Sequence, residues 1–486
     1  MDAFNWLILS PIKPEMFLGV LGLLLLMLGD FRGASSASFI MTAVLASLVV
    51  AMGLVYKADL SVTDTVGGMV IADSFSSWLK LMLLGGLFAS LALSVSWLKE
   101  NHMLKFEYPL LVLFSGIGAL LMVSAVNLLS LYVSLELSSL CLYVLAAIRR
   151  DHLQSTEAGL KYFILGAISS GLLLFGISLV YGYIGSIGYA EIGNALLSKE
   201  LPSVGAIIGA VFILAGLSFK ISAVPFHMWT PDVYQGAPTP VTALFAIVPK
   251  VAAFGLIIRL LTGPFLPIHH ELVQIVLFIA VASMAWGAFA GLVQNNIKRL
   301  LAYSSIANMG YAALGLLSGQ ADGVAAIIIY LSIYMVTLAG VFAVLMSLRQ
   351  KGEALENIPD FAGLSKTSPF AAYILAGLMF SMSGIPPMAG FFGKLFVLQS
   401  AVAAGYVGVA IFGVLASVVG SYYYLRLIKV MFFDDAKEDV PAATCCTTRN
   451  VVAAISIAFI LLLTVWPNGL LAEAQNAAQS LFHVSP

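Results

Sequence analysis

The chain has 486 residues, of which 61% are apolar and only 10% are charged, and its formal net charge is −1. Its mean hydropathy is +1.02. Soluble domains have about 45–50% apolar and about 25% charged residues, so this composition excludes a water-soluble protein and predicts one that lies in a lipid bilayer. The sequence has no basic patch, and no nucleic-acid partner is expected.

The apolar runs lack the alternation of barrel strands, so the sequence predicts an all-α polytopic membrane protein. Charged and Gly/Pro-rich segments separate about fourteen transmembrane helices, each of which crosses about 30 Å of hydrocarbon. The predicted spans are 15–29, 38–56, 73–97, 107–126, 128–148, 158–183, 204–230, 239–262, 271–294, 299–318, 322–348, 369–402, 405–432 and 450–471.

The connections between these spans carry further information. Met1–Trp6 has no basic residue, so the first span is expected to be retained rather than cleaved as a signal peptide. The apolar stretch 106–148 is too long for one crossing, which predicts a tight turn near Asn127. Cys141 lies in an apolar run and Cys445–Cys446 in a polar loop, a pattern that predicts neither a disulfide framework nor a metal site.

The distribution of basic residues predicts the orientation, because cytoplasmic loops carry an excess of lysine and arginine. Twelve basic residues lie near the ends of odd-numbered spans: Arg32, Lys99, Lys105, Arg149, Arg150, Lys298, Arg299, Arg349, Lys351, Lys366, Lys437 and Arg449. Three lie on the other side: Lys13, Lys57 and Lys199. The sequence therefore predicts that both termini lie outside, on the periplasmic side.

Six ionisable residues lie inside predicted spans: Lys80, Glu136, Lys161, Lys220, Lys250 and Lys394. A charge at mid-bilayer costs about 2.5–3.5 kcal/mol, so such residues are candidates for function. Lys250 lies about eleven residues from either end of its span and is too deep to reach water easily. Pro249 beside it removes a backbone hydrogen bond. The alternative is a lysine paired inside the bundle for structure alone.

Glu136 belongs to a polar stripe in an otherwise apolar span. At helical spacing Tyr132, Glu136, Ser139 and Tyr143 share one face, which is expected to contact protein or water rather than lipid. The alternative is a seam of hydrogen bonds between two helices.

Two spans are interrupted by helix-breaking residues, and each contains a lysine. Lys220 precedes Pro225 and Pro231, with His227 between the two prolines. Lys394 follows a second break, formed by Gly384, Pro386, Pro387 and Gly390. Broken helices at membrane depth face protein or a water-filled cavity. Lys220 is expected to exchange protons there, although a position at the membrane interface is the alternative.

The two broken spans are the seventh and the twelfth, so they cross the membrane in opposite directions, as in an inverted repeat. The sequence therefore predicts two inverted five-helix repeats. The corresponding divisions are 1–106 (spans 1–3), 107–262 (first repeat, spans 4–8), 271–432 (second repeat, spans 9–13) and 450–486 (span 14).

Other polar residues are weaker candidates for a proton path. Lys161 follows Glu157 by four residues, so it either serves the path or anchors a helix start. Lys80 has no assigned role, and His227 is either a proton relay or a structural histidine. A polar face in the tenth span either lines a wet path or forms a packing seam; it consists of Ser304, Asn308 and Tyr311.

Buried lysines beside broken helices are typical of proton conduction, cation antiport or small-solute transport. The sequence has no Gly-rich nucleotide loop, metal-ligand cluster or haem motif, so redox or ATP chemistry is expected in partners. A membrane transferase that uses Glu136 and His227 is an alternative from a different functional class. No nucleophile motif or long exposed loop supports it.

Three segments resemble the antiporter-like membrane subunits of respiratory complex I. They are FKISAVPFHMWTPDVYQGAPTPVTALFAIVPK (219–250), NNIKRLLAYSSIANMGY (295–311) and SGIPPMAGFFGK (383–394). Within that family Trp229–Gly236 is similar to the N subunits, and the length and Lys394 favour N over the L and M subunits. The resemblance covers nearly the whole chain.

This resemblance implies a non-redox, proton-translocating subunit of a bacterial NADH-quinone oxidoreductase in the plasma (inner) membrane. It implies that Glu136 pairs with Lys220, that Lys161 lies near the glutamate, that Lys250 is central and that Lys394 controls the far exit. Implied partners are the other membrane-arm subunits and membrane lipids. Flavin, iron–sulfur clusters, NADH and quinone are expected in partner subunits, with no cofactor or metal in this chain. The alternative is a subunit of a multi-subunit cation/proton antiporter or a membrane-bound hydrogenase.

Overall fold

The computed structural model describes residues 9, 11–58, 66–198, 203–350, 353–435, 442–443 and 446–482. Some residues that entered the sequence-based predictions lie outside this part of the chain; they are Met1–Trp6, Lys199, Lys351, Lys437 and Cys445.

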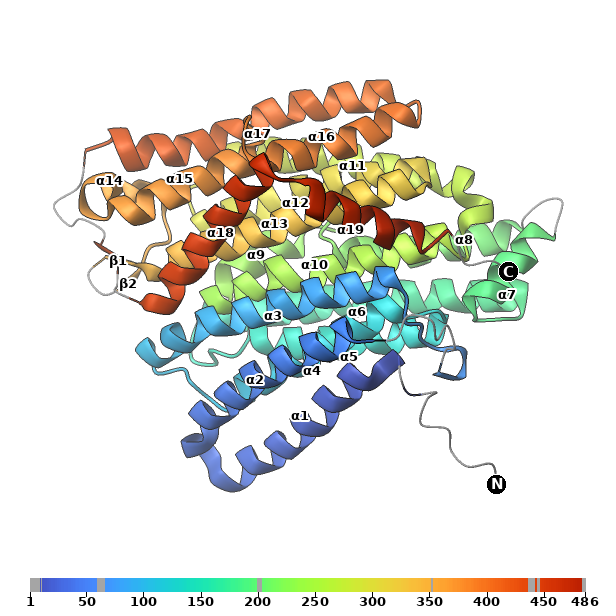
Figure 1. Ribbon diagram of the computed structural model, residues 1–486, viewed down its shortest axis with the longest axis horizontal. Helices are drawn as coiled ribbons and strands as arrows, with labels where there is room; N and C mark the ends of the chain where they lie inside the picture. The colour runs from blue at the N-terminus through green and yellow to red at the C-terminus, as the bar shows by residue number, and fades with distance from the viewer. Residues whose placement is uncertain are drawn as a thin grey trace.

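The described residues form a helical bundle with one small sheet (Figure 1). Its α-helices are α1 (Lys13–Arg32), α2 (Ala37–Tyr56), α3 (Ser74–Glu100), α4 (Glu107–Ser124), α5 (Leu128–Ala146), α6 (Leu153–Ile184), α7 (Tyr189–Leu197), α8 (Val204–Lys220), α9 (Trp229–Gly236), α10 (Thr239–Thr262), α11 (His269–Leu292), α12 (Ile297–Leu314), α13 (Ala321–Ser347), α14 (Leu364–Thr367), α15 (Pro369–Ser383), α16 (Ala389–Ala403), α17 (Val407–Phe433), α18 (Thr447–Val465) and α19 (Asn468–Gln479).

Short 3₁₀ helices and strands connect some of these helices. The 3₁₀ helices are η2 (Gly33–Ser36), η3 (Val66–Gly68), η4 (Leu266–Ile268), η5 (Gly315–Ser318) and η6 (Ile358–Phe361). The strands are β1 (Leu348–Gln350), β2 (Glu353–Ala354) and β3 (Ala442–Ala443), which pair antiparallel in the order β2-β1-β3.

The predicted spans correspond to helices along the chain. Eleven segments of the described residues are long and apolar enough to cross a membrane, and one of them, Lys13–Tyr56, contains both α1 and α2. The apolar helices α8, α15 and α16 are shorter, because they belong to the two interrupted spans. The protein is thus an all-α polytopic membrane protein with two broken helices, as predicted. The division into two inverted repeats stays a prediction.

The turn predicted near Asn127 is confirmed. Helix α4 ends at Ser124 and α5 begins at Leu128, and the Asn127 side chain accepts a hydrogen bond from the backbone N–H of Leu129 at 2.8 Å. This side chain satisfies one of the backbone donors left free at a helix start, so asparagine at this position favours a new helix.

The first break separates α8, which ends at Lys220, from α9, which begins at Trp229. The backbone groups released by the break are bonded by side chains of neighbouring elements. The Trp229 Nε1 donates to the carbonyl oxygen of Phe219 at 3.0 Å, and the N–H of Val224 donates to the Ser283 hydroxyl of α11 at 2.9 Å. Irregular backbone is tolerated at this depth because protein groups replace the missing helical bonds.

The second break separates α15 from α16. Gly384 follows α15 with a φ of 81°, a left-handed conformation that favours glycine, and the adjacent Pro386 and Pro387 have no backbone N–H to donate to a helix. The two breaks differ in where their lysine lies. Lys220 ends the helix before its break, whereas Lys394 lies in α16, after its break.

Two features differ from the prediction. Span 450–471 is wrong at its end, because Pro467 cannot donate a backbone bond and α18 stops at Val465 before a separate helix, α19. Helix α7 forms in a predicted connection, since Tyr189, Ile192 and Leu196 make one buried face of a short amphipathic helix.

The arrangement places three nearly fully buried helices, α10, α12 and α13, inside the bundle. Helices α1 and α2 lie at one edge, α15–α17 lie at the opposite edge, and α18 crosses α13 (Figure 1). Helix α10 packs against α3, α4 and α13, so a side chain at its midpoint is removed from lipid on every side.

Candidate functional site

Lys220, at the C-terminal end of α8, is 9% exposed and points toward the polar face of α5. Its Nζ donates to the Ser139 hydroxyl at 2.8 Å and to the Tyr143 hydroxyl at 3.2 Å. A cation at the last turn of a helix also interacts favourably with the helix dipole. The predicted stripe on α5 therefore faces protein, and it supplies both of the hydroxyl partners of this lysine.

Glu136 lies one turn from Ser139 on the same stripe, and its Oε1 accepts a hydrogen bond from the Ser170 hydroxyl of α6. The structure has no ion pair between Glu136 and Lys220 among the described residues, so the implied pairing is not a direct contact in this conformation. Ser170 also lies beside the Tyr143 hydroxyl. The Ser170 hydroxyl, which bonds the carboxylate, and the Tyr143 hydroxyl, which bonds the ammonium group, thus lie between the two charged groups.

A glycine on α6 makes room for this arrangement. A Cβ atom at Gly166 would lie 2.1 Å from the Tyr143 oxygen and 2.6 Å from its ring carbon Cζ. Because the tyrosine ring is buried and rigid, any larger residue at position 166 would displace it from Lys220.

The ion-pair partners of Lys161 in the described part of the chain are Glu157 and Asp232. Its Nζ pairs with Glu157 at 2.7 Å, which confirms the helical pair, and with Asp232 of α9 at 2.7 Å. Asp232 also pairs with Arg299 of α12 at 2.7 Å, so one carboxylate joins three helices. Burial alone would raise the pKa of Asp232, but hydrogen bonds from Lys161 and Arg299 outweigh burial and hold that pKa below its usual value.

Lys250 is 1% exposed at the middle of α10, which continues as a helix through Pro249. Its Nζ donates to the Ser305 hydroxyl of α12 and lies 5.2 Å from the centre of the Tyr234 ring. Ser305 is hydrogen-bonded in turn to the Tyr334 hydroxyl of α13. No ion pair of Lys250 is present in the described part of the chain.

Lys394 of α16 is 8% exposed and has a different set of partners. Its Nζ donates to the backbone carbonyl of Ser383, beside the break, and to the Ser417 hydroxyl of α17, both at 2.9 Å. It also lies 5.0 Å from the centre of the Tyr311 ring.

The polar face of α12 lies between Lys250 and Lys394. The Tyr330 hydroxyl of α13 donates to Asn308 Oδ1 at 2.6 Å, and Asn308 Nδ2 donates to the Ser304 carbonyl at 2.8 Å. The Tyr311 hydroxyl donates to the Gly413 carbonyl of α17 at 2.8 Å.

A small cavity lies beside this region and is lined by Lys394 but not by Lys250. It measures about 20 Å³, and its lining includes Asn308, Tyr330, Tyr334 and Lys394. A polar cavity needs about 10–15 Å³ to hold one water molecule. Tyr334, which also lines this cavity, bonds to Ser305, the partner of Lys250, so the cavity lies between the hydrogen-bonded surroundings of Lys250 and the side chain of Lys394.

The remaining candidates, His227 and Lys80, are not among the hydrogen-bond partners of Lys220, Lys250 and Lys394 in the described part of the chain. His227 is half-buried in the first break, with its ring 5.6 Å from that of Trp286, and no hydrogen bond joins it to Lys220 or Lys250 among the described residues. Lys80 pairs with Glu15 at 2.7 Å, and both are buried, so this pair fastens α3 to α1. The described residues contain no cluster of three metal-ligating side chains.

Several residues at the site were not singled out from the sequence. Ser170, Ser305 and Ser417 bind the charged groups through single hydroxyls, and a serine in an apolar helix gives no specific signal. Tyr330 and Tyr334 are four residues apart on α13, so they share a face, and this spacing could have identified them. Asp232 lies in the 219–250 segment that resembles the family, but no partner was assigned to it from the sequence.

Comparison with known proteins gives consistent results. The family model described as "NADH:quinone oxidoreductase/Mrp antiporter, TM" matches residues 125–420. The chain is 47% identical to NADH-quinone oxidoreductase subunit N of Rhodospirillum rubrum over 99% of each chain. Among solved structures, it resembles a chain of respiratory complex I from Thermus thermophilus with a TM-score of 0.82 and 31% identity, covering 95% of this chain and 99% of that one.

A chain of the Mrp complex from Dietzia sp. DQ12-45-1b has the same fold, with a TM-score of 0.86 and 21% identity over 98% of each chain. That identity supports the shared fold alone. The near-complete match to a subunit N sequence is more specific than the fold, which is common to both kinds of complex. The chain therefore belongs to the NADH-quinone oxidoreductase subunit N family.

Proposed function

We propose that this chain is a proton-translocating subunit of the membrane arm of an NADH-quinone oxidoreductase. Within the chain itself, one observation supports the proposal most directly. Lys220, Lys250 and Lys394 are buried and have hydroxyl or carbonyl partners, with no ion pair among the described residues. Ammonium groups held in this way are costly inside a membrane protein, and their retention is explained by proton transfer.

The Glu136–Lys220 region is the proposed point of control. Burial disfavours the charged form of a lysine, and a nearby carboxylate favours it. Movement of Glu136 toward or away from Lys220 therefore changes whether the lysine holds its proton or releases it toward Lys250. Glu136 is half-buried and hydroxyl groups lie between it and Lys220, so such a movement breaks no direct ion pair.

The energy required is moderate. Moving one charge against about 150 mV costs about 3.5 kcal/mol. A change in proton affinity of about 2–3 pKa units supplies this amount. The energy comes from redox chemistry in other subunits, which carry the flavin, the iron–sulfur clusters and the sites for NADH and quinone.

The proposed path runs from Lys220 to Lys250, through Ser305 and Tyr334, to Lys394 and the outside. The small cavity beside Asn308 and Lys394 supports a water in the last step. Ser304 holds Asn308 in place along this step, and Tyr311 contributes its ring beside Lys394. His227 and Lys161 lie off the line, so we assign them no transfer step.

The proposal includes the position of the chain in the membrane. It is a multi-pass protein of the bacterial plasma membrane with both termini outside, as the distribution of basic residues indicates. Spans 4–8 and 9–13 are two inverted repeats, each with one broken helix. The partners are other membrane-arm subunits.

The test begins with purification of the tagged chain in mild detergent, followed by mass spectrometry and an NADH–quinone assay. Recovery of flavin and iron–sulfur subunits with inhibitor-sensitive activity is expected. Recovery of small membrane subunits alone, with sodium-dependent transport and no NADH activity, would instead favour a cation/proton antiporter, which the family model also includes.

A further inference from the structure

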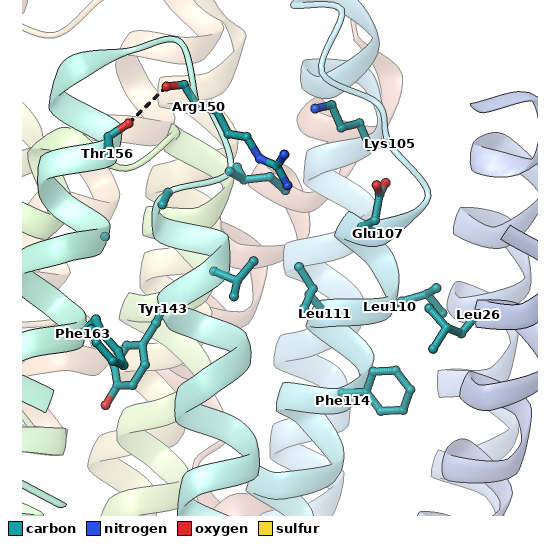
Figure 2. A pocket seen from close by; sticks show the side chains of 14 residues that line it. Leu26, Lys105, Glu107, Leu110, Leu111, Phe114, Tyr143, Arg150, Thr156 and Phe163 are labelled. Carbon is teal, nitrogen blue, oxygen red and sulfur yellow. Dashed lines mark hydrogen bonds between the residues drawn. The ribbon is translucent and has the colours of Figure 1, made fainter. Parts of the chain in front are cut away.

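A groove on the outer surface of the bundle lies away from the line of lysines but shares one wall with it. It is formed by α1, α4, α5 and α6 and has a volume of about 710 Å³. Its sides are apolar and include Val144. They also include Leu26, Phe114 and Phe163, which are labelled in Figure 2. This volume falls in the range of about 300–1,000 Å³ that is typical of small-molecule sites.

One end of the groove is charged. Lys105 and Glu107, at the start of α4, and Arg150, after the end of α5, line it together (Figure 2). All three are exposed, and none of them forms an ion pair within the described part of the chain. The groove thus has an apolar body and a polar mouth that carries two positive charges and one negative charge.

The inner wall of the groove includes Tyr143. The ring of this residue separates the groove from Lys220, because its hydroxyl bonds to the Lys220 Nζ on the inner side. Whatever fills the groove therefore determines how close bulk water comes to that hydrogen bond.

We propose that this groove binds one phospholipid whose headgroup carries both a phosphate and an ammonium group, as in phosphatidylethanolamine. The phosphate binds Lys105 and Arg150, and the ammonium group binds Glu107. An acyl chain lies along Phe114, Val144 and Phe163 and covers the ring of Tyr143. The inference concerns lipid binding and holds whether or not the chain moves protons.

The charge pattern distinguishes this occupant from others. An acidic lipid would satisfy the two cations but would leave the Glu107 carboxylate beside a second anion, which is unfavourable. A helix from a neighbouring subunit would fill the apolar body, but three unpaired charges would remain at its end unless the partner supplied matching ones.

The test uses the intact assembly in nanodiscs that contain phosphatidylethanolamine and phosphatidylglycerol, with a trace of either lipid carrying a photoreactive acyl chain. Peptide mass spectrometry then locates the crosslinks. Labelling by the phosphatidylethanolamine probe is expected on α1, α4, α5 and α6 at the groove, and a Lys105→Ala/Arg150→Ala variant should lose most of it. Arg149→Ala is the matched control, since Arg149 is exposed and adjacent but does not line the groove.

Glu107→Gln separates the two lipid classes. It should reduce labelling by the phosphatidylethanolamine probe several-fold while labelling by phosphatidylglycerol stays the same or rises. Equal labelling by both probes in the unaltered protein, or labelling unchanged in all rim variants, would overturn the proposal. So would the absence of labelling in these four helices, which would indicate that another subunit covers the groove. Co-purification of partner subunits verifies that each variant assembles.

Discussion

The surroundings of Lys220 and Lys394 differ although each lysine lies beside a broken helix. Lys220 bonds to two side-chain hydroxyls, and a carboxylate lies one hydroxyl group further away. Lys394 bonds to a backbone carbonyl at the break and to one hydroxyl, and no carboxylate pairs with it among the described residues. The same interruption of a helix therefore supports two different polar environments.

This difference indicates different tasks for the two lysines. Glu136 is half-buried and forms no ion pair among the described residues, so we expect it to be able to move and the electrostatic stabilisation of Lys220 to be adjustable. The backbone carbonyl of Ser383 is held by the geometry of the break, so one of the two hydrogen-bond partners of Lys394 has a fixed position. We therefore expect control at Lys220 and a constant exit step at Lys394. The following substitutions test that distinction.

Glu136→Gln should have the largest effect because it removes the adjustable charge while keeping the shape of the side chain. Proton translocation in proteoliposomes should fall at least about tenfold, which corresponds to about 1.4 kcal/mol in a barrier. Glu271→Gln, at an exposed position in the first turn of α11, is the control. A rate like that of the unaltered protein in Glu136→Gln would remove the basis for the comparison.

Ser417→Asp should give the Lys394 region the carboxylate that it lacks. The new ion pair would hold Lys394 in its charged form and should slow translocation by up to about tenfold. Ser417→Ala removes only one hydrogen bond and should have a smaller effect. If the aspartate and alanine variants pump equally well, Lys394 does not need to release its proton.

Tyr143→Phe and Tyr311→Phe compare the two regions through the same chemical change. The Tyr143 hydroxyl bonds Lys220, so its loss should slow translocation about fivefold, the equivalent of a hydrogen bond of about 1 kcal/mol. The Tyr311 hydroxyl bonds the Gly413 carbonyl, and its ring beside Lys394 is retained in phenylalanine. That variant should lose thermal stability with little change in translocation, and the opposite ranking would be inconsistent with the assigned contacts.

Asp232→Asn should have the smallest effect, on stability only. The ion pairs of Asp232 are partly exposed, so their loss should cost less than about 1 kcal/mol. Because the folded protein holds the pKa of Asp232 below its usual value, the stabilisation is complete at neutral pH and is lost as pH falls through that lowered pKa. The thermal unfolding temperature of the variant should be lower than that of the unaltered assembly at pH 7, and this difference in unfolding temperature should shrink at acid pH. A difference that grows with acidity would contradict the assignment.

Much of the fold follows from local sequence signals. Pro225 lies in the first break and Pro386 in the second, since proline removes a helical hydrogen bond and can break a helix, although α10 continues through Pro249. Asn127 marks the α4–α5 turn through its cap. The interruption before α19 was missed because Pro467 lies near the end of an apolar run, where a break changes little in the hydrophobic pattern.

The site was predictable in its charges but not in its contacts. Glu136, Lys220, Lys250 and Lys394 stand out because charge is rare in apolar spans. Which helix faces them depends on tertiary packing. The hydroxyl of Ser170 between Glu136 and Tyr143, and the Asp232 carboxylate beside Lys161, therefore could not be assigned from spacing along one helix.

The most direct test of the central claim is the ratio of protons moved to electrons transferred, measured in proteoliposomes that contain the whole assembly with Lys220→Met. Methionine is unbranched like lysine and one heavy atom shorter, and it removes the exchangeable charge together with the two hydrogen bonds that Nζ donates. If protons pass through Lys220, the assembly should form, but the ratio should fall or turnover should stall. A ratio and a turnover rate equal to those of the unaltered assembly would contradict the proposed proton path.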